Sequence, residues 1–102
     1  MVEKHKIDGI FTEEYHAAIN GKYRMVNPSD VCIMCGEKIK PDSGHFLYLT
    51  GMGEALIAKT AYINIHMHDD DLGYYPVGPT CGSKIPAKFR FARKGSIPKE
   101  NA

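Results

Sequence analysis

The sequence contains no hydrophobic run long enough to cross a membrane and no linker that would divide it into two halves. A membrane-spanning helix needs about 18 apolar residues, and no run approaches that length. The segment Met1 to Ile10 is polar and lacks the apolar core of a signal peptide. With a length of 102 residues, these absences favour one small domain in the cytoplasm, with no membrane partner.

Cysteine is scarce and odd in number, which excludes a complete set of intramolecular disulfides. The three cysteines are Cys32, Cys35 and Cys81, and thiols stay reduced in the cytosol. A domain of this size buries a limited fraction of its surface and gains stability from a cross-link such as a bound metal ion. We therefore expect the cysteines to bind a metal ion.

The motif "CIMCG" is typical of a zinc knuckle. Two thiolates three positions apart can chelate one ion if the backbone turns tightly, and Gly36 permits that turn. A redox pair would open a helix, which Gly36 and the nearby Pro41 disfavour. Structural Zn²⁺ takes four N or S ligands, so Cys81, at the expected start of a helix, is the third candidate.

A histidine is the expected fourth ligand, and three candidates stay open. The segment Tyr62–His68 alternates apolar and polar residues and predicts a strand that presents His66 and His68 on one face. Packed behind the knuckle, this strand would direct His66 toward the metal. His45, ten residues after Cys35, and His68, beside the acidic loop, are the alternative fourth ligands.

Local patterns predict the remaining elements. Residues 11–19 have helical spacing with Thr12 as a possible N-cap, but Asn20-Gly21 favours a β-hairpin over this helix. The run "HFLYLT" predicts a strand, "EALIAKTA" two helical turns, and the segment from Pro86 to Gly95 a C-terminal helix.

Positive charge gathers at the C-terminal end although the net charge is only +1. From Cys81 onward six Lys or Arg residues face one acid, giving +5, and the preceding residues carry −4. This asymmetry favours a nucleic acid as partner. The predicted contact residues are Lys84, Lys88, Arg90, Arg93 and Lys94. The alternative is a protein partner, which the acidic "DDD" run and exposed tyrosines such as Tyr74 and Tyr75 would suit.

The pieces "CIMCG", "NIHMH" and "GYYPVGPTCGSKIP", between Cys32 and Pro86, resemble small zinc-finger proteins of treble-clef or zinc-ribbon type that are common in phage genomes. The resemblance implies that Cys32, Cys35, His66 and Cys81 hold one zinc ion. It also implies a phage or mobile-element protein in the host cell cytoplasm, with a host enzyme or defence complex as an alternative partner. The chain departs from the family in its extra segment "HFLYLTGMGEALIAKTA".

The expected architecture is a small α+β domain, zinc-stabilised and treble-clef or zinc-ribbon-like, with antiparallel β-hairpins and a C-terminal helix. Residues 1–30 would form a hairpin or short helix on the core, 31–95 the zinc-binding core, and 96–102 a flexible tail. We predict a non-enzymatic binding module with no small-molecule substrate. The run "HMHDDD" raises a ββα-metal nuclease as a further alternative, but three thiolates make the metal a poor Lewis acid.

Overall fold

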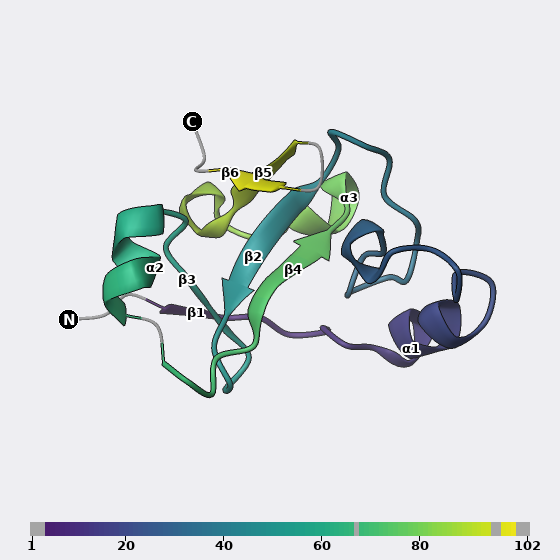
Figure 1. Cartoon of the computed structure of the whole chain (residues 1–102), viewed down its shortest axis with the longest axis horizontal. Coiled ribbons are helices and arrows are strands. Elements are labelled where there is room, and N and C mark those ends of the chain that lie inside the picture. The colour runs from purple at the N-terminus through teal and green to yellow at the C-terminus, as the bar shows by residue number, and fades with distance from the viewer. Residues whose placement is uncertain (1–3, 67, 95–96, 100–102) are drawn as a thin grey trace.

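The computed structural model describes residues 4–66, 68–94 and 97–99, and it has the expected α+β composition (Figure 1). The elements in chain order are β1 Lys4–Lys6, α1 Glu13–Asn20, the 3₁₀ turn Pro28–Asp30, β2 His45–Leu49, β3 Glu54–Leu56, α2 Thr60–His66, β4 Gly73–Val77, α3 Pro79–Gly82, the 3₁₀ turn Ala87–Phe89, β5 Phe91–Lys94 and β6 Ile97–Lys99. Within these ranges no helix has the length and apolar character that crossing a membrane requires.

Strand β2 is the centre of an antiparallel sheet. Its whole length pairs with β4, from His45 opposite Val77 to Leu49 opposite Gly73. β3 and β5 also pair with β2, and β1 and β6 extend the sheet beyond them. The prediction of a strand in "HFLYLT" is confirmed, and the turn at "GMG" leads into β3.

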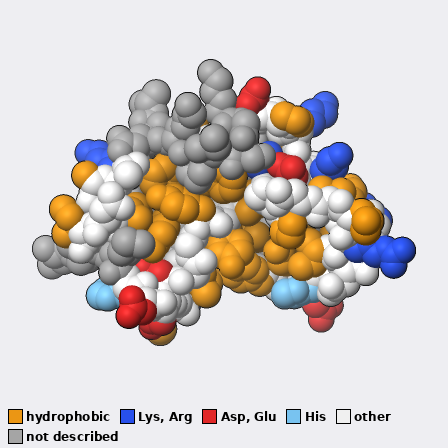
Figure 2. Space-filling view, viewed as in Figure 1, with side chains coloured by type: hydrophobic (Ala, Val, Ile, Leu, Met, Phe, Trp, Pro, Cys, Tyr) orange, Lys and Arg blue, Asp and Glu red, His pale blue; other side chains and the backbone are white. Residues whose placement is uncertain are grey.

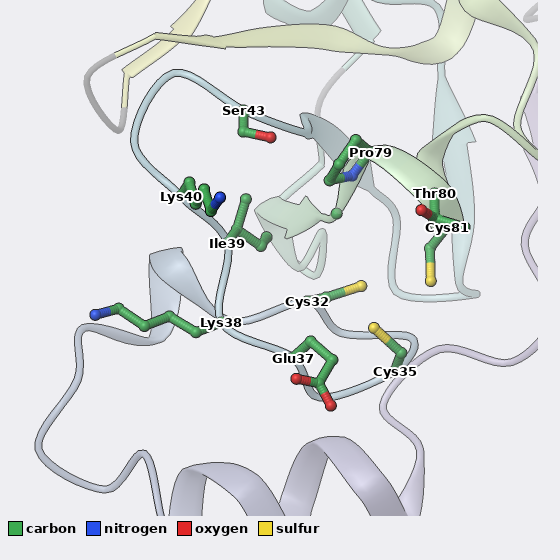
Figure 3. A pocket seen from close by; sticks show the side chains of 11 residues that line it. Cys32, Cys35, Glu37, Lys38, Ile39, Lys40, Ser43, Pro79, Thr80 and Cys81 are labelled. Carbon is green, nitrogen blue, oxygen red and sulfur yellow. The ribbon is translucent and has the colours of Figure 1, made fainter.

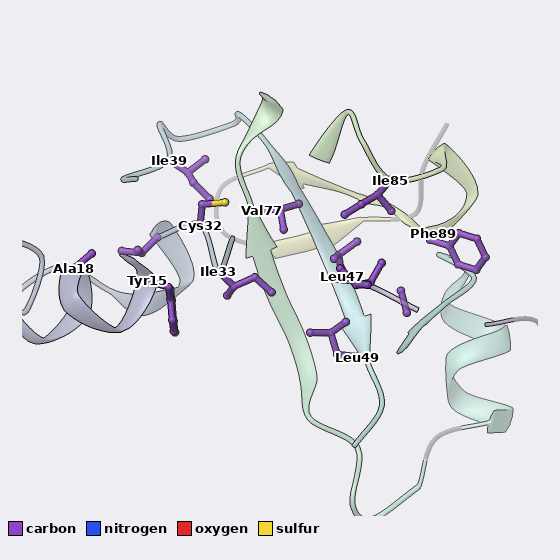
Figure 4. Close-up of a cluster of buried hydrophobic side chains, with 13 residues drawn as sticks. Tyr15, Ala18, Cys32, Ile33, Ile39, Leu47, Leu49, Val77, Ile85 and Phe89 are labelled. Atoms are coloured by element: carbon purple, nitrogen blue, oxygen red, sulfur yellow. The ribbon is translucent and has the colours of Figure 1, made fainter. Parts of the chain in front are cut away.

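Alternate side chains of β2 enter two separate hydrophobic clusters, because successive residues of a strand point to opposite faces. Leu47 and Leu49 belong to the first cluster, which also holds Cys32 and is drawn in Figure 4. Phe46 and Tyr48 belong to the second cluster. Both faces of β2 are therefore covered, which explains why its residues 46–49 are all hydrophobic instead of alternating with polar residues.

The favoured N-terminal hairpin does not form, and the alternative helix is observed as α1. The Thr12 hydroxyl accepts a hydrogen bond from the Tyr15 amide at 3.2 Å and caps the helix. Gly21 ends the helix with a negative φ of −123° and donates to the Ala18 carbonyl, so Asn20-Gly21 is a helix end and not a hairpin turn. The helix buries Tyr15 and Ala18 on one face, and this burial stabilises it over the hairpin.

The predicted strand Tyr62–His68 is also corrected, since residues 60–66 form α2. Ile63 is 1% exposed and packs into the second cluster, whereas Ile65 is 74% exposed. A strand with alternate burial would have covered both side chains. The alternation over seven residues is too short to exclude a helix of two turns.

The predicted C-terminal helix is replaced by a 3₁₀ turn and strand β5. Phe89, Phe91 and Arg93 are buried, while Ala92 between the last two is exposed. This period of two is the pattern of a strand. The residues of "EALIAKTA" likewise form β3 and only the beginning of α2, and β6 lies within the segment expected as a tail.

Candidate metal centre

The structure brings all three cysteine side chains together. The Sγ atoms of Cys32, Cys35 and Cys81 lie within 4.8 Å of one another, and Figure 3 shows them converging from two segments of the chain. A tetrahedral zinc ion with Zn–S bonds of about 2.3 Å separates its sulfur ligands by about 3.8 Å. Small side-chain rotations therefore suffice to close the three thiols around one ion. The three cysteines are positioned to hold a metal ion.

The Cys32–Cys35 segment is a tight turn held by backbone hydrogen bonds. The Cys32 amide donates to the Glu37 carbonyl, and the Gly36 amide donates to the Cys32 carbonyl, each at 2.9 Å. Gly36 has a φ of +74°, and a Cβ atom there would lie 2.5 Å from the Glu14 carbonyl oxygen of α1. The glycine is required both by the turn and by the approach of the helix.

The third cysteine reaches the site through β4 and α3. The Ile33 amide donates to the Pro76 carbonyl at 3.1 Å, which ties the turn to β4. Immediately beyond that strand, Gly78 lies next to Cys32, where an added Cβ atom would lie 3.9 Å from Cys32 Cβ and 4.0 Å from its Sγ. The chain then enters α3, which carries Cys81. Pairing of β4 with β2 thus fixes where the third thiol lies.

The environment shifts the pKa values of the three thiols in different directions. Burial acts to raise the pKa of Cys32, but backbone hydrogen bonds from Gly78, Cys35 and Met34 outweigh it and lower that pKa. For Cys81, burial and then the neighbouring Cys32 raise the pKa to about 12. Burial also raises the pKa of Cys35. A divalent cation that displaces the thiol protons would relieve the repulsion among three thiolates.

His45 lies near the cysteines but makes a different interaction. Its ring packs on Gly82, and Nε2 lies 3.4 Å from Nη1 of Arg90. Arginine is permanently protonated and donates, so the Nε2 lone pair of His45 accepts this bond. Burial, followed by the charge of Arg90, lowers the pKa of His45. The structure therefore gives its Nε2 atom a partner other than a metal.

The other two histidine candidates lie on or after α2. His66 is the last residue of this helix, and its side chain lies outside the described part of the structure. Helix α2 lies at one end of the molecule, whereas α3 lies nearer the middle, beside the end of β4 (Figure 1). His68 is exposed, and its amide donates to Asp71 Oδ2 at 2.9 Å. Within the described residues the thiols form a group without any imidazole, and a histidine ligand stays a prediction.

The predicted contact residues differ in their surroundings. Lys84 and Lys88 are exposed, as a contact with phosphates requires. Nη1 of Arg90 donates to the Gly82 carbonyl at 3.2 Å as well as facing His45. The side chain of Lys94 lies outside the described residues.

Arg93 is corrected from a surface contact to an internal structural residue. It is 3% exposed, and its guanidinium donates to the carbonyl oxygens of Ser29, Ser43 and Lys40. Nη2 also pairs with Asp30 Oδ1 at 3.1 Å. These acceptors lie on the segments that flank the cysteine turn. The alternation of Phe89, Phe91 and Arg93 was the one sequence signal for this inward orientation.

The thiols also form part of the wall of a pocket of about 500 Å³ (Figure 3). The remaining lining residues are Glu37, Lys38, Ile39, Lys40, Ser43, Gly78, Pro79 and Thr80. A metal held by the three sulfurs would therefore border this space. No protein-family model, curated protein or solved structure matches the chain, so the assignment of a candidate metal centre rests on the geometry of the three thiols.

Proposed function

We propose that Cys32, Cys35 and Cys81 bind one structural Zn²⁺ ion and that the protein is a non-enzymatic binding module. The observation that carries this proposal is the convergence of three sulfurs from separate segments to within 4.8 Å. Thiolate ligands favour zinc, and cytosolic sites of this donor type are commonly structural. Electron donation by three thiolates weakens the metal as a Lewis acid, which supports a structural role over catalysis.

The zinc ion would connect two segments that lie far apart in the sequence. Cys32 and Cys35 belong to the turn against α1, and Cys81 belongs to α3. Metal binding would therefore add its free energy to the folding of both segments. The treble-clef or zinc-ribbon likeness and the relation to phage-type zinc-finger proteins belong to the same proposal, which the cysteine spacing supports.

The test is metal content combined with unfolding. Elemental analysis of the purified protein should give about one zinc per chain, and a chelator should lower its thermal stability reversibly. Cys32→Ser and Cys81→Ser should lose zinc and unfold at lower temperature. His16→Ala, at an exposed histidine of α1 that is not among the ligand candidates, serves as the control and should keep both properties. Native stability and full zinc content in the two serine variants would refute the proposal.

For the partner we propose nucleic acid, contacted by the exposed Lys84 and Lys88. Affinity for duplex DNA should fall steeply with salt, because phosphate contacts release counterions. Lys84→Gln and Lys88→Gln should each lower the slope of log affinity against log salt by about 1. Lys22→Gln, on the exposed end of the α1 segment, removes the same charge elsewhere and should leave the slope unchanged. A slope unaffected by either contact variant would contradict this choice of surface.

A protein partner is the second candidate, and an apolar surface favours it. Figure 2 shows hydrophobic side chains gathered across the middle of one face, over β4 and toward α1. Leu72 and Tyr74 are 41% and 40% exposed, and both line a groove of about 210 Å³ with Tyr15, Tyr75 and Pro76. Tyr74→Ser should abolish capture of such a partner at high salt, whereas a nucleic acid would already be released there.

A further inference from the structure

The three thiols line part of the 500 Å³ pocket. An inference that rests on the proposed zinc site, and extends it, follows from this position. A tetrahedral metal on three sulfurs has a fourth coordination position. Gly78 lies next to Cys32 and presents no donor side chain to the pocket. Because the three thiols themselves line this pocket, the fourth position of an ion bound to them would face it.

Among the described residues no histidine, aspartate or glutamate joins the group of three thiols. In Figure 3 the Glu37 carboxylate points away from the three sulfurs. Nε2 of His45 faces Arg90 at 3.4 Å. Helix α2, which ends at His66, packs on the second hydrophobic cluster through Ile63. The described structure thus leaves the pocket as the route by which a donor can approach the sulfurs.

The pocket lining indicates the chemistry of a ligand. Its volume lies in the range of small-molecule sites, about 300–1,000 Å³. Ile39 and Pro79 offer apolar contact. Lys40 lines the same pocket, so its ammonium group can pair with a negative charge on a ligand. A metal with three sulfur ligands favours another soft donor. These features together fit a short organic thiol that carries a carboxylate.

We propose that the fourth position of the metal opens into this pocket and binds the thiolate of a small mercaptocarboxylate, with its carboxylate near Lys40. Formation of the sulfur–metal bond releases the thiol proton to solvent, and no electron is transferred. The ligand would complete a four-sulfur site without a fourth protein side chain. Its binding would thereby couple the stability of the fold to the supply of the ligand.

The experiment uses the intact protein loaded with Co²⁺, whose visible spectrum reports the ligands of a tetrahedral site. Addition of 3-mercaptopropionate should change the spectrum saturably and strengthen the sulfur-to-cobalt charge-transfer band while cobalt stays bound. The thiol without a carboxylate, 2-mercaptoethanol, should bind about threefold more weakly, as expected for one exposed ion pair. Propionate, which lacks the thiol, should leave the spectrum unchanged.

Variants of the protein locate the ligand. Lys40→Gln should remove the preference for 3-mercaptopropionate over 2-mercaptoethanol. Lys59→Gln, at an exposed lysine outside the pocket lining, should retain it. Glu37→Gln and His66→Ala should have the starting spectrum of the unsubstituted protein. A changed starting spectrum in either variant would identify a protein side chain as the fourth ligand and overturn the inference.

The same titration separates this inference from the zinc proposal. Failure of the protein to bind one equivalent of Co²⁺ or Zn²⁺ would refute the metal site itself. Stoichiometric cobalt with a spectrum that thiols do not alter would refute only the exogenous ligand. Removal of cobalt from the protein by the thiol would likewise refute it, because the thiol would then act as a competing chelator.

Discussion

A Cβ atom added to Gly82 would lie 2.6 Å from Cδ2 of His45, which is closer than side-chain atoms can approach. The His45 ring therefore packs directly on the backbone of α3, next to Cys81. We predict that Gly82→Ala lowers the free energy of unfolding by about 1–3 kcal/mol, the usual cost of overpacking, and weakens metal binding. Urea denaturation and zinc titration measure the two effects.

Gly78→Ala is a matched control for this change. A Cβ atom at Gly78 would meet only Cys32, at 3.9 and 4.0 Å, which is ordinary van der Waals contact. The residue also has a φ of −69°, which alanine adopts without strain. Equal stability of the two alanine variants would contradict the close packing of His45 on α3.

A second prediction concerns Gly36, where a comparison with Gly9 separates the conformational cost of an alanine from its packing cost. Gly36→Ala should be strongly destabilising, since φ is +74° and the new Cβ atom would lie 2.5 Å from the Glu14 carbonyl oxygen. Gly9→Ala has a similar φ of +70° and open space around the Cβ position. It should cost only the conformational part, about 1–2 kcal/mol. The difference in free energy of unfolding between these variants measures the contact of α1 with the cysteine turn.

The buried guanidinium of Arg93 gives a third prediction. Arg93→Ala leaves the carbonyl oxygens of Ser29, Ser43 and Lys40 without their donor and should lower the free energy of unfolding by at least the cost of one unsatisfied buried acceptor, about 1–3 kcal/mol. Arg24→Ala, at an exposed arginine, should change stability by less than about 0.5 kcal/mol. Denaturation of both variants at equal metal saturation tests this. A small effect at Arg93 would mean that water replaces its hydrogen bonds.

A pH dependence follows from His45. Burial and the Arg90 charge lower its pKa in the folded protein below the ordinary 6.5, so the unfolded chain binds the proton more strongly. The stabilising effect of the neutral ring is complete above about pH 6.5 and declines as the pH falls toward the folded pKa. Free energies of unfolding measured from pH 7.5 to 5 should therefore fall more steeply for the native chain than for His45→Gln. Parallel curves would contradict the lowered pKa.

Two parts of the fold, the cysteine turn and the central strand, depend on neighbouring residues in the sequence and could be predicted from it. The tight turn at "CIMCG" depends on Gly36, and the strand at "HFLYLT" depends on a run of apolar residues that is buried on both faces. The odd number of cysteines and the motif "CIMCG" predicted a metal-binding site from the sequence alone. The structure places their sulfurs within 4.8 Å, which confirms that the three can act together.

Long-range packing decided the segments that were predicted incorrectly. Ile63 and Ile65 alternate equally well in a strand, but only Ile63 finds a place in the second cluster, within a helix. In "FRFAR" the arginine at position 93 was counted with the polar residues, although internal carbonyl groups allow it to alternate inward with Phe91. The second cluster takes Phe46 and Phe91 from distant strands, and the acceptors of Arg93 lie about 50 or more residues before it, so local periodicity could not identify these partners.

The division of β2 between two hydrophobic clusters restricts how this protein can change in length. Insertion or deletion of one residue within His45–Leu49 would exchange the two faces of the strand beyond that point. Leucine side chains would then face the second cluster, and aromatic side chains would face the first. It would also shift the pairing with β4 that carries the chain to Cys81. Variation in length is therefore expected in connections such as residues 22–26, whose backbone hydrogen bonds are local, while the spacing from His45 to Leu49 should be invariant among functional homologues.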